Sequence, residues 1–177
     1  MFSVGILTVS DKGSRGERVD ESGPVIRGIM ESSGANVVEY AVVPDEKVII
    51  SATLERWADR GNIDLILTNG GTGLSPRDHT PEATLAVVDR LVPGLVEAMR
   101  AESFKKSPAG ILSRAVAGLR RRSLVINLPG SPQAVKECLA IIMPAIPHAI
   151  EVLRGEAAEC ATRADLHPHR SADSRAA

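Results

Sequence analysis

The chain has 177 residues, 44% of them hydrophobic, and a formal net charge of −1. This length favours one domain, and this hydrophobic content is sufficient for a folded core. Aromatic residues are scarce, with two Phe, one Trp and one Tyr. A surface that stacks nucleic-acid bases is therefore not expected, and the near-neutral charge also argues against a nucleic-acid partner.

Short apolar runs alternate with amphipathic segments along the chain. Strands rich in β-branched residues are predicted at residues 3–10, 37–43, 63–68 and 123–128. Helices are predicted at residues 24–33, 45–61, 80–89 and 94–103, followed by a long helix over 132–153. Pro144 and Pro147 should kink the long helix or split it in two. Residues 114–120 are interpreted as a strand that turns at Arg121 and Arg122, with a helix as the alternative.

This order of strands and helices predicts a three-layer αβα protein of the α/β class. The sheet should be mostly parallel, with helices on both of its faces. Residues 1–155 should form this domain. Residues 156–177 are polar and lack periodicity, so they are expected to be a disordered tail. Ligands of such sheets bind beyond the carboxyl ends of the strands, where the loops 11–23, 70–82 and 129–132 should meet.

The sequence also favours a particular compartment. Cys138 and Cys160 show no metal-ligand spacing, and Cys138 fits an apolar helical pattern as a small core residue. The N-terminus lacks the features of a signal peptide. No apolar run reaches the ~18 residues of a membrane span. We therefore expect a cytoplasmic protein without a membrane partner.

A glycine-rich loop follows the third predicted strand and leads into a helix. Glycines at three of four positions allow close backbone approach, and their N–H groups can form an anion-binding nest. The residues expected to contact a phosphate-bearing substrate are Gly70, Gly71, Thr72, Gly73 and Ser75. The loop lacks the Gly-Lys-Ser/Thr of a P-loop and the third glycine of a dinucleotide fingerprint. A tight structural turn is the alternative explanation.

Charged residues near this loop strengthen the phosphate hypothesis. Arg77 can contact phosphate oxygens. Asp78 would be repelled by bare phosphate, so it makes most sense as a ligand of Mg²⁺ held by that phosphate. Asp45, after the second strand, should reach the same edge and complete a magnesium-binding pair. The alternatives are a helix-dipole role for Asp78 and a helix cap for Asp45.

The two other loops carry further candidate residues. Ser10, Asp20 and Ser22 could bind a polar heterocycle through side-chain hydrogen bonds, or could be ordinary turn and capping groups. Gly130 and Ser131 could bind a phosphate through an N–H and a hydroxyl. Capping the long helix is the alternative role of Ser131.

Six segments together resemble the MogA/MoaB family of molybdenum cofactor biosynthesis proteins. The resemblance spans about residues 3–155. It is carried by Leu7-Thr8-Val9-Ser10-Asp11, Asp20-Glu21-Ser22-Gly23, Val43-Pro44-Asp45-Glu46, Thr68-Asn69-Gly70-Gly71-Thr72-Gly73, Pro76-Arg77-Asp78-His79-Thr80-Pro81-Glu82 and Asn127-Leu128-Pro129-Gly130-Ser131-Pro132.

The resemblance implies a homotrimer that binds molybdopterin and ATP, with a downstream molybdenum-insertion protein as partner. It implies Mg²⁺-dependent transfer of AMP from ATP to the terminal phosphate of molybdopterin, with Asp45 and Asp78 as the catalytic, magnesium-binding pair. The attacking group is itself a phosphate, so no general base is required. Two alternatives stay open, a non-catalytic molybdopterin carrier and an unrelated nucleotide-binding enzyme.

Overall fold

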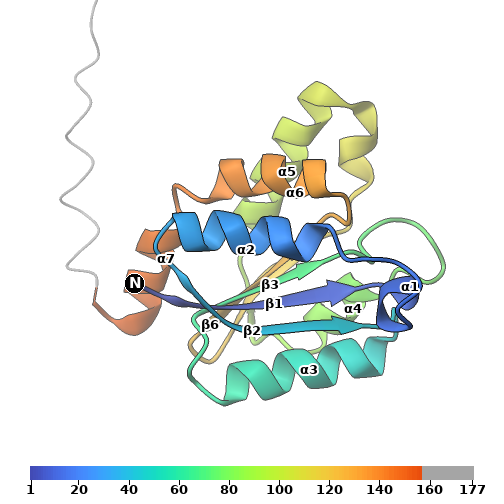
Figure 1. The fold of residues 1–177 in the computed structure, drawn as a ribbon. Coiled ribbons are helices and arrows are strands. Elements are labelled where there is room, and N and C mark those ends of the chain that lie inside the picture. The colour runs from blue at the N-terminus through green and yellow to red at the C-terminus, as the bar shows by residue number, and fades with distance from the viewer. Residues whose placement is uncertain (157–177) are drawn as a thin grey trace, which may run out of the picture.

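A computed structural model describes residues 1–156 of the chain and shows a six-stranded sheet between two layers of helices (Figure 1). The strands are β1 (Ser3–Val9), β2 (Asn36–Val43), β3 (Leu65–Asn69), β4 (Arg90–Leu91), β5 (Ala117–Arg120) and β6 (Ser123–Leu128). The helices are α1 (Asp11–Ser14), α2 (Ser22–Ser32), α3 (Lys47–Asp59), α4 (Thr80–Leu85), α5 (Pro93–Lys106), α6 (Pro132–Ile142) and α7 (Ile146–Arg154), with the 3₁₀ helix η1 at Pro108–Leu112.

The sheet has the strand order β2-β1-β3-β6-β5-β4. Strands β1, β2, β3 and β6 are parallel, whereas β5 pairs antiparallel with both β6 and β4. The predicted three-layer, mostly parallel α/β fold is therefore confirmed. Strands β1, β3 and β6 end side by side, with Asn69 paired to both Thr8 and Leu128. Their carboxyl ends thus bring three separate loops to one edge.

Side-chain alternation in the central strands divides the core in two. On β3, Leu65 and Leu67 pack with α2, α5, α6 and α7, whereas Ile66 packs with α3 and α4. Figure 1 shows α2, α5 and α6 above the sheet and α3 below it. Trp57 on α3 is buried against Gly5 of β1, where a side chain would crowd its ring. Aliphatic side chains fill most of both layers, as the composition predicted.

Several element boundaries differ from prediction. The loop over 11–23 contains α1, because Ser10 caps a short helical turn there. The helix predicted over 80–89 ends at Leu85, since the Asp89 N–H donates to the Leu119 carbonyl and β4 then joins the sheet. The predicted helix over 94–103 extends over Pro93–Lys106 and leads into η1. Short-range patterns did not reveal these tertiary pairings.

The long helix is split into α6 and α7 around Pro144, as expected, and Gly155 terminates α7 with φ of 74°. The expected disorder of the tail concerns residues that lie almost entirely outside those described. Within residues 1–156, no helix is long and apolar enough to cross a membrane.

Candidate active site

The glycine loop starts with two residues that only glycine fits. Gly70 has φ of 96°, and a Cβ there would overlap the carbonyl oxygen of Val9. Gly71 has φ of 64°, and its Cβ would lie 3.0 Å from Asp45 Oδ1. The Thr80 hydroxyl at the start of α4 donates to the Gly70 carbonyl at 2.9 Å. The tight-turn explanation thus holds for the first two glycines, and the turn brings the backbone against Asp45.

The loop borders an open cavity of 890 Å³ at the carboxyl ends of β1 and β3. The sequence-predicted residues that line it are Ser10, Asp20, Ser22, Asp45, Gly70, Gly71, Asp78, Gly130 and Ser131. Thr72 and Gly73 line a different cavity on the other side of the loop. Ser75 and Arg77 are exposed on the outer part of the loop. The tertiary structure thus brings both predicted acids together and divides the predicted loop between two cavities.

Asp45 and Asp78 both lie against the glycine loop, Asp45 beside Gly71 and Asp78 beside Gly73. Asp45 Oδ2 accepts the backbone N–H of Asp11 at 2.8 Å. Burial raises the pKa of Asp45, and the charges of Asp11 and Asp78 add to that effect. Asp78 Oδ2 accepts the Ser75 N–H at 2.9 Å. Asp45 does not cap α3, which has no side-chain cap. The ionised form of Asp45 is poorly compensated by nearby positive charge.

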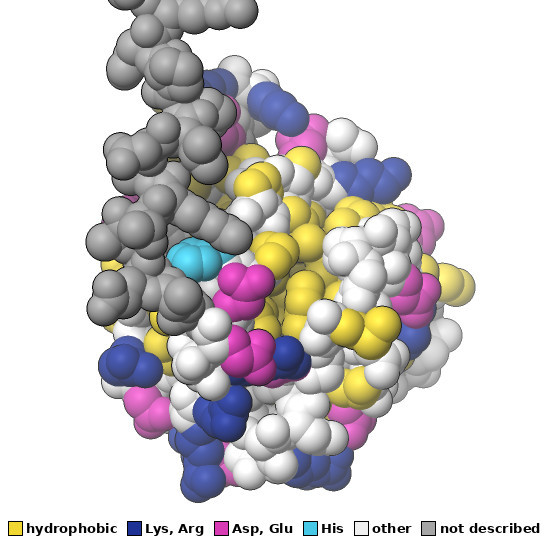
Figure 2. All heavy atoms as spheres, turned by 90° about the vertical axis from the view of Figure 1, so that its left-hand side faces the viewer, with side chains coloured by type: hydrophobic (Ala, Val, Ile, Leu, Met, Phe, Trp, Pro, Cys, Tyr) yellow, Lys and Arg dark blue, Asp and Glu magenta, His cyan; other side chains and the backbone are white. Residues whose placement is uncertain are grey.

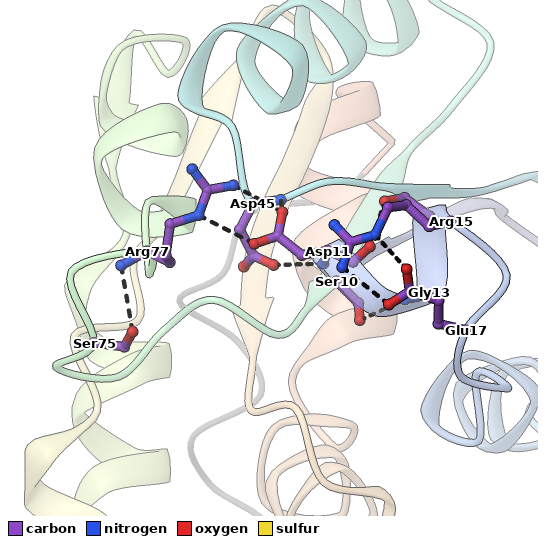
Figure 3. A network of polar contacts seen from close by, with 9 residues as sticks. Ser10, Asp11, Gly13, Arg15, Glu17, Asp45, Ser75 and Arg77 are labelled. Atoms are coloured by element: carbon purple, nitrogen blue, oxygen red, sulfur yellow. Dashed lines mark hydrogen bonds and ion pairs between the residues drawn. The ribbon is translucent and has the colours of Figure 1, made fainter.

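Asp11 connects Asp45 to Arg77 (Figure 3). Asp11 Oδ1 accepts the Asp45 N–H at 3.1 Å, so these two residues bind each other's backbone. Arg77 donates to both Asp11 oxygens, at 2.8 Å from Nη2 and 3.1 Å from Nε. The Arg77 hydrogen bonds lower the pKa of Asp11 below its usual value. The predicted phosphate ligand Arg77 is thus paired with a carboxylate in this structure.

Asp20 holds the first loop in place. Its Oδ1 accepts the N–H groups of Ser22 and Gly23 at the start of α2, and its Oδ2 accepts the hydroxyls of Thr8 and Tyr40. Although burial opposes ionisation, these donors hold the pKa of Asp20 below its usual value. Asp20 therefore has the capping role that the sequence left open, at the wall of the cavity.

Of the four predicted serines, Ser10, Ser22 and Ser131 line the cavity and make hydrogen bonds with the backbone. Ser10 Oγ accepts the Gly13 N–H at 3.0 Å, and Ser131 Oγ accepts the Ala134 N–H at 3.2 Å. Both serines are thus helix caps, the alternative weighed for Ser131. Ser22 Oγ donates to the Gly130 carbonyl at 2.8 Å and joins two of the loops. These contacts shape the cavity wall.

Arg114 braces the glycine loop, and sequence reasoning missed it. Its guanidinium donates to the carbonyls of Gly73 and Asp78, both at 2.7 Å, and pairs with Glu82. Its N–H donates to the Thr72 carbonyl at 2.9 Å. Arg114 thus fixes the loop around Asp78 from the segment before β5. A single arginine in an unassigned segment gives no pattern that would have revealed this role.

A second cavity of 350 Å³ lies between α5, η1 and α6. Its lining is mainly apolar and includes Val96, Met99 and Cys138. Arg100 and Ser103 contribute polar groups, and Arg100 donates to the Ala115 carbonyl at 3.1 Å. Sequence reasoning missed this cavity as well. The spacing of Arg100, Ser103 and Lys106 along α5 could have indicated it.

The paired acids suit a divalent cation that is shared with phosphate. Among residues 1–156, no three His, Cys, Asp or Glu side chains are grouped so that they could hold a metal by themselves. Mg²⁺ is usually held by one or two carboxylates together with substrate phosphates and water. Asp45 and Asp78 supply such carboxylates, and a cation would offset the burial and charge repulsion that raise the pKa of Asp45.

The fold and site define an α/β protein that presents a glycine loop and two acids to one ligand. Residues 5–148 match the family described as “Probable molybdopterin binding domain”. The chain is 42% identical over 154 residues to the molybdopterin adenylyltransferase of Helicobacter pylori strain J99. The matched region covers 86% of this chain and 88% of that protein.

Solved structures agree with this match. The molybdopterin biosynthesis enzyme MoaB of Thermus thermophilus is similar at a TM-score of 0.83 and 54% identity, covering 88% of this chain and 98% of that one. A MogA structure is similar at a TM-score of 0.81 and 40% identity, covering 85% and 99%. The chain belongs to the MogA/MoaB family of molybdopterin-binding proteins, as its six motifs predicted.

Proposed function

We propose that this protein acts in molybdenum cofactor biosynthesis as a molybdopterin adenylyltransferase. It transfers AMP from ATP to the terminal phosphate of molybdopterin and releases pyrophosphate. The relatives that carry this activity in their names match most of the chain. The observation that carries the proposal is that Asp45 and Asp78 line one cavity beside a glycine loop.

The reaction needs positioned phosphates more than a protein nucleophile. The Gly70 and Gly71 turn brings the backbone close to the space where the ATP phosphates would lie, and Gly130 packs directly against Gly70. Asp45 and Asp78 would hold Mg²⁺, which when bound neutralises phosphate charge. Ser10 and Ser22 keep the surrounding loops in place through their caps and cross-links. These residues would thus bind and orient the substrates.

Two cavities on either side of one loop suit a reaction with two substrates. We assign the acidic cavity to ATP and the smaller, apolar cavity to the pterin, because a flat heterocycle favours apolar walls with a few polar groups. Thr72 and Gly73 line the pterin side, and Gly70 and Gly71 line the ATP side. The reacting phosphates would meet across the loop between them.

The proposal is tested by combining purified protein with molybdopterin and ATP, with and without Mg²⁺, and measuring pyrophosphate. We expect pyrophosphate only when all three components are present. Asp78→Asn should lower the rate at least about tenfold, because loss of a metal or transition-state contact costs at least ~1.4 kcal/mol. A smaller loss would contradict the role of Asp78. Molybdopterin binding without pyrophosphate would instead support the carrier alternative.

Assembly and location are part of the same proposal. We propose a cytoplasmic homotrimer that passes its product to a molybdenum-insertion protein. Exposed hydrophobic side chains on the glycine loop, β4, α5 and η1 offer an interface; they are Leu74, Leu91, Phe104, Ile111 and Leu112. Multi-angle light scattering should give three times the 18.7 kDa chain mass. A monomer mass at micromolar concentration would contradict the trimer.

A further inference from the structure

Asp11 keeps the guanidinium of Arg77 beside the acidic cavity rather than in its lining. Figure 3 shows the two side chains pointing toward one another next to Asp45. The Arg77 side chain is 54% exposed and that of Asp11 is 28% exposed. Exposed ion pairs contribute little net stability, because water solvates both partners well when they separate. Arg77 is therefore held in place, but it is free to exchange partners.

The lining of the same cavity is strongly acidic. Among the described residues that form it, four are acids and one is basic; they are Asp20, Glu21, Asp45, Asp78 and Arg18. A polyphosphate without a metal ion would meet like charge there, whereas one that carries a divalent cation brings the missing positive charge with it. The availability of Arg77 therefore decides how tightly the cavity binds a metal-free polyphosphate.

Building on the adenylyl-transfer function proposed above, we propose that Asp11 is a specificity-determining residue of the ATP site. By holding Arg77, it makes the cavity selective for metal-complexed polyphosphate over the metal-free form. When complexed ATP enters, Arg77 exchanges the Asp11 carboxylate for phosphate oxygens, with which guanidinium groups form paired hydrogen bonds. Metal-free ATP lacks the cation that first makes entry favourable.

The backbone around Asp11 fits this exchange. The Asp11 N–H donates to Asp45 Oδ2 at 2.8 Å, and the Asp45 N–H donates to Asp11 Oδ1 at 3.1 Å. These two bonds fix Asp11 relative to Asp45 independently of Arg77. Only the exposed arginine side chain has to move, so the carboxylates that receive the cation stay in position.

The experiment is calorimetric titration of the full chain with ATP, once with excess Mg²⁺ and once with EDTA. We expect the wild type to bind Mg·ATP clearly more tightly than metal-free ATP. Asp11→Asn retains an oxygen acceptor but loses the charge that holds Arg77. It should bind metal-free ATP at least about fivefold more tightly than the wild type, the lower range of site-to-site coupling, and lose most of the metal preference.

Arg77→Gln supplies the coupled measurement. Alone, it should weaken Mg·ATP binding but hardly change metal-free ATP binding, because Asp11 already withholds the arginine. Combined with Asp11→Asn, it should remove the gain for metal-free ATP. Glu17→Gln is the matched control, because Glu17 pairs with Arg15 through both oxygens in the same loop. It removes the same charge and should leave the metal preference unchanged.

The outcomes separate this inference from the underlying function. If the wild type binds Mg·ATP but Asp11→Asn leaves metal-free binding unchanged, Asp11 has no role in selectivity and the adenylyltransferase proposal stands. A gain that persists in the double variant, or one that Glu17→Gln reproduces, reflects general charge and also overturns the inference. Should Asp11→Asn fail to fold, a marked loss of metal-free binding in Arg77→Gln alone overturns it. Absence of nucleotide binding by the wild type overturns both proposals.

Discussion

Asp11 and Asp45 each accept a hydrogen bond from the other's backbone N–H, at 3.1 Å and 2.8 Å. This reciprocal pair connects the residue after β1 to the loop after β2. Two carboxylates are thereby held close together, and Asp11 is the one that the Arg77 guanidinium neutralises. Repulsion between acids is costly in a folded protein, so such an arrangement is more readily explained by a ligand than by stability.

The first prediction concerns Asp45→Asn. At neutral pH the variant should be at least as heat-stable as the wild type, while its adenylyl transfer falls at least about tenfold. The folded pKa of Asp45 is raised by burial, so ionised Asp45 disfavours folding. Stability of the wild type should decline as pH rises from the ordinary Asp pKa, ~3.9, through the folded value. Melting curves from pH 3 to 8 should show the variant's advantage vanishing in acid.

The second prediction concerns Gly70→Ala. An alanine at this position would have to adopt φ of 96° with its Cβ against the Val9 carbonyl. The free energy of unfolding should therefore fall by about 1–3 kcal/mol or more. For a chain of this size, each kcal/mol lowers the melting temperature by about 2–4 °C. Gly28→Ala in α2 is the matched control, because a Cβ there meets open space. It should be neutral or slightly stabilising. Equal effects of both substitutions would contradict this interpretation of Gly70.

The third prediction concerns Asp20→Ala, which removes the acceptor for the start of α2. The free energy of unfolding at pH 7 should fall by about 0.5–2 kcal/mol, as for other helix caps. Because the folded pKa of Asp20 is lowered, its contribution is present above the unfolded pKa and is lost as pH falls through the folded value. Denaturant titrations should show different stabilities for the two proteins at pH 7 and similar stabilities in acid.

Tyr40→Phe provides a comparison at the same site. It removes one donor to Asp20 and leaves the two backbone donors of α2 in place. Burial and the Asp20 hydrogen bond raise the pKa of Tyr40 to about 12, so the tyrosine stays a neutral donor across the range. We expect Tyr40→Phe to lower the free energy of unfolding by less than Asp20→Ala does. A larger loss would mean that Tyr40, rather than the helix cap, is the main partner.

The fourth prediction concerns Arg114→Gln. Glutamine cannot reach the Gly73 and Asp78 carbonyls and Glu82 together, so the loop around Asp78 should loosen. Adenylyl transfer should fall about tenfold or more, because misplaced catalytic groups lose rate steeply. Amide hydrogen exchange over residues 70–82 should rise, with the central strands unchanged. Lost activity without increased exchange would show that Arg114 contacts substrate instead.

One face away from the site remains without a role. Figure 2, turned from the view of Figure 1, shows hydrophobic side chains at the centre of this face with charged ones around them. Partly buried hydrophobic residues of α2, α6 and α7 include Ile29, Ile141 and Ala149. Contiguous apolar surface is more typical of contact with another molecule than isolated apolar side chains are.

The sequence by itself determined the order of the main strands and helices, the α/β class and the family. Buried strands and helix stripes leave local patterns, and glycines, prolines and acids at fixed spacings carried the resemblance. It also indicated Asp45 and Asp78 correctly as neighbours, because both follow parallel strands whose carboxyl ends share an edge.

Only the tertiary structure decided which partner each side chain has. Asp11 with Arg77, Asp20 with Tyr40 and Arg114 with the glycine loop join segments far apart in the chain. No local pattern specifies such pairs, because each residue alone fits a loop or a cap. The division of the glycine loop between two cavities likewise depends on how α5 and η1 pack against it. Those contacts arise from packing of whole elements, beyond the reach of spacing along the sequence.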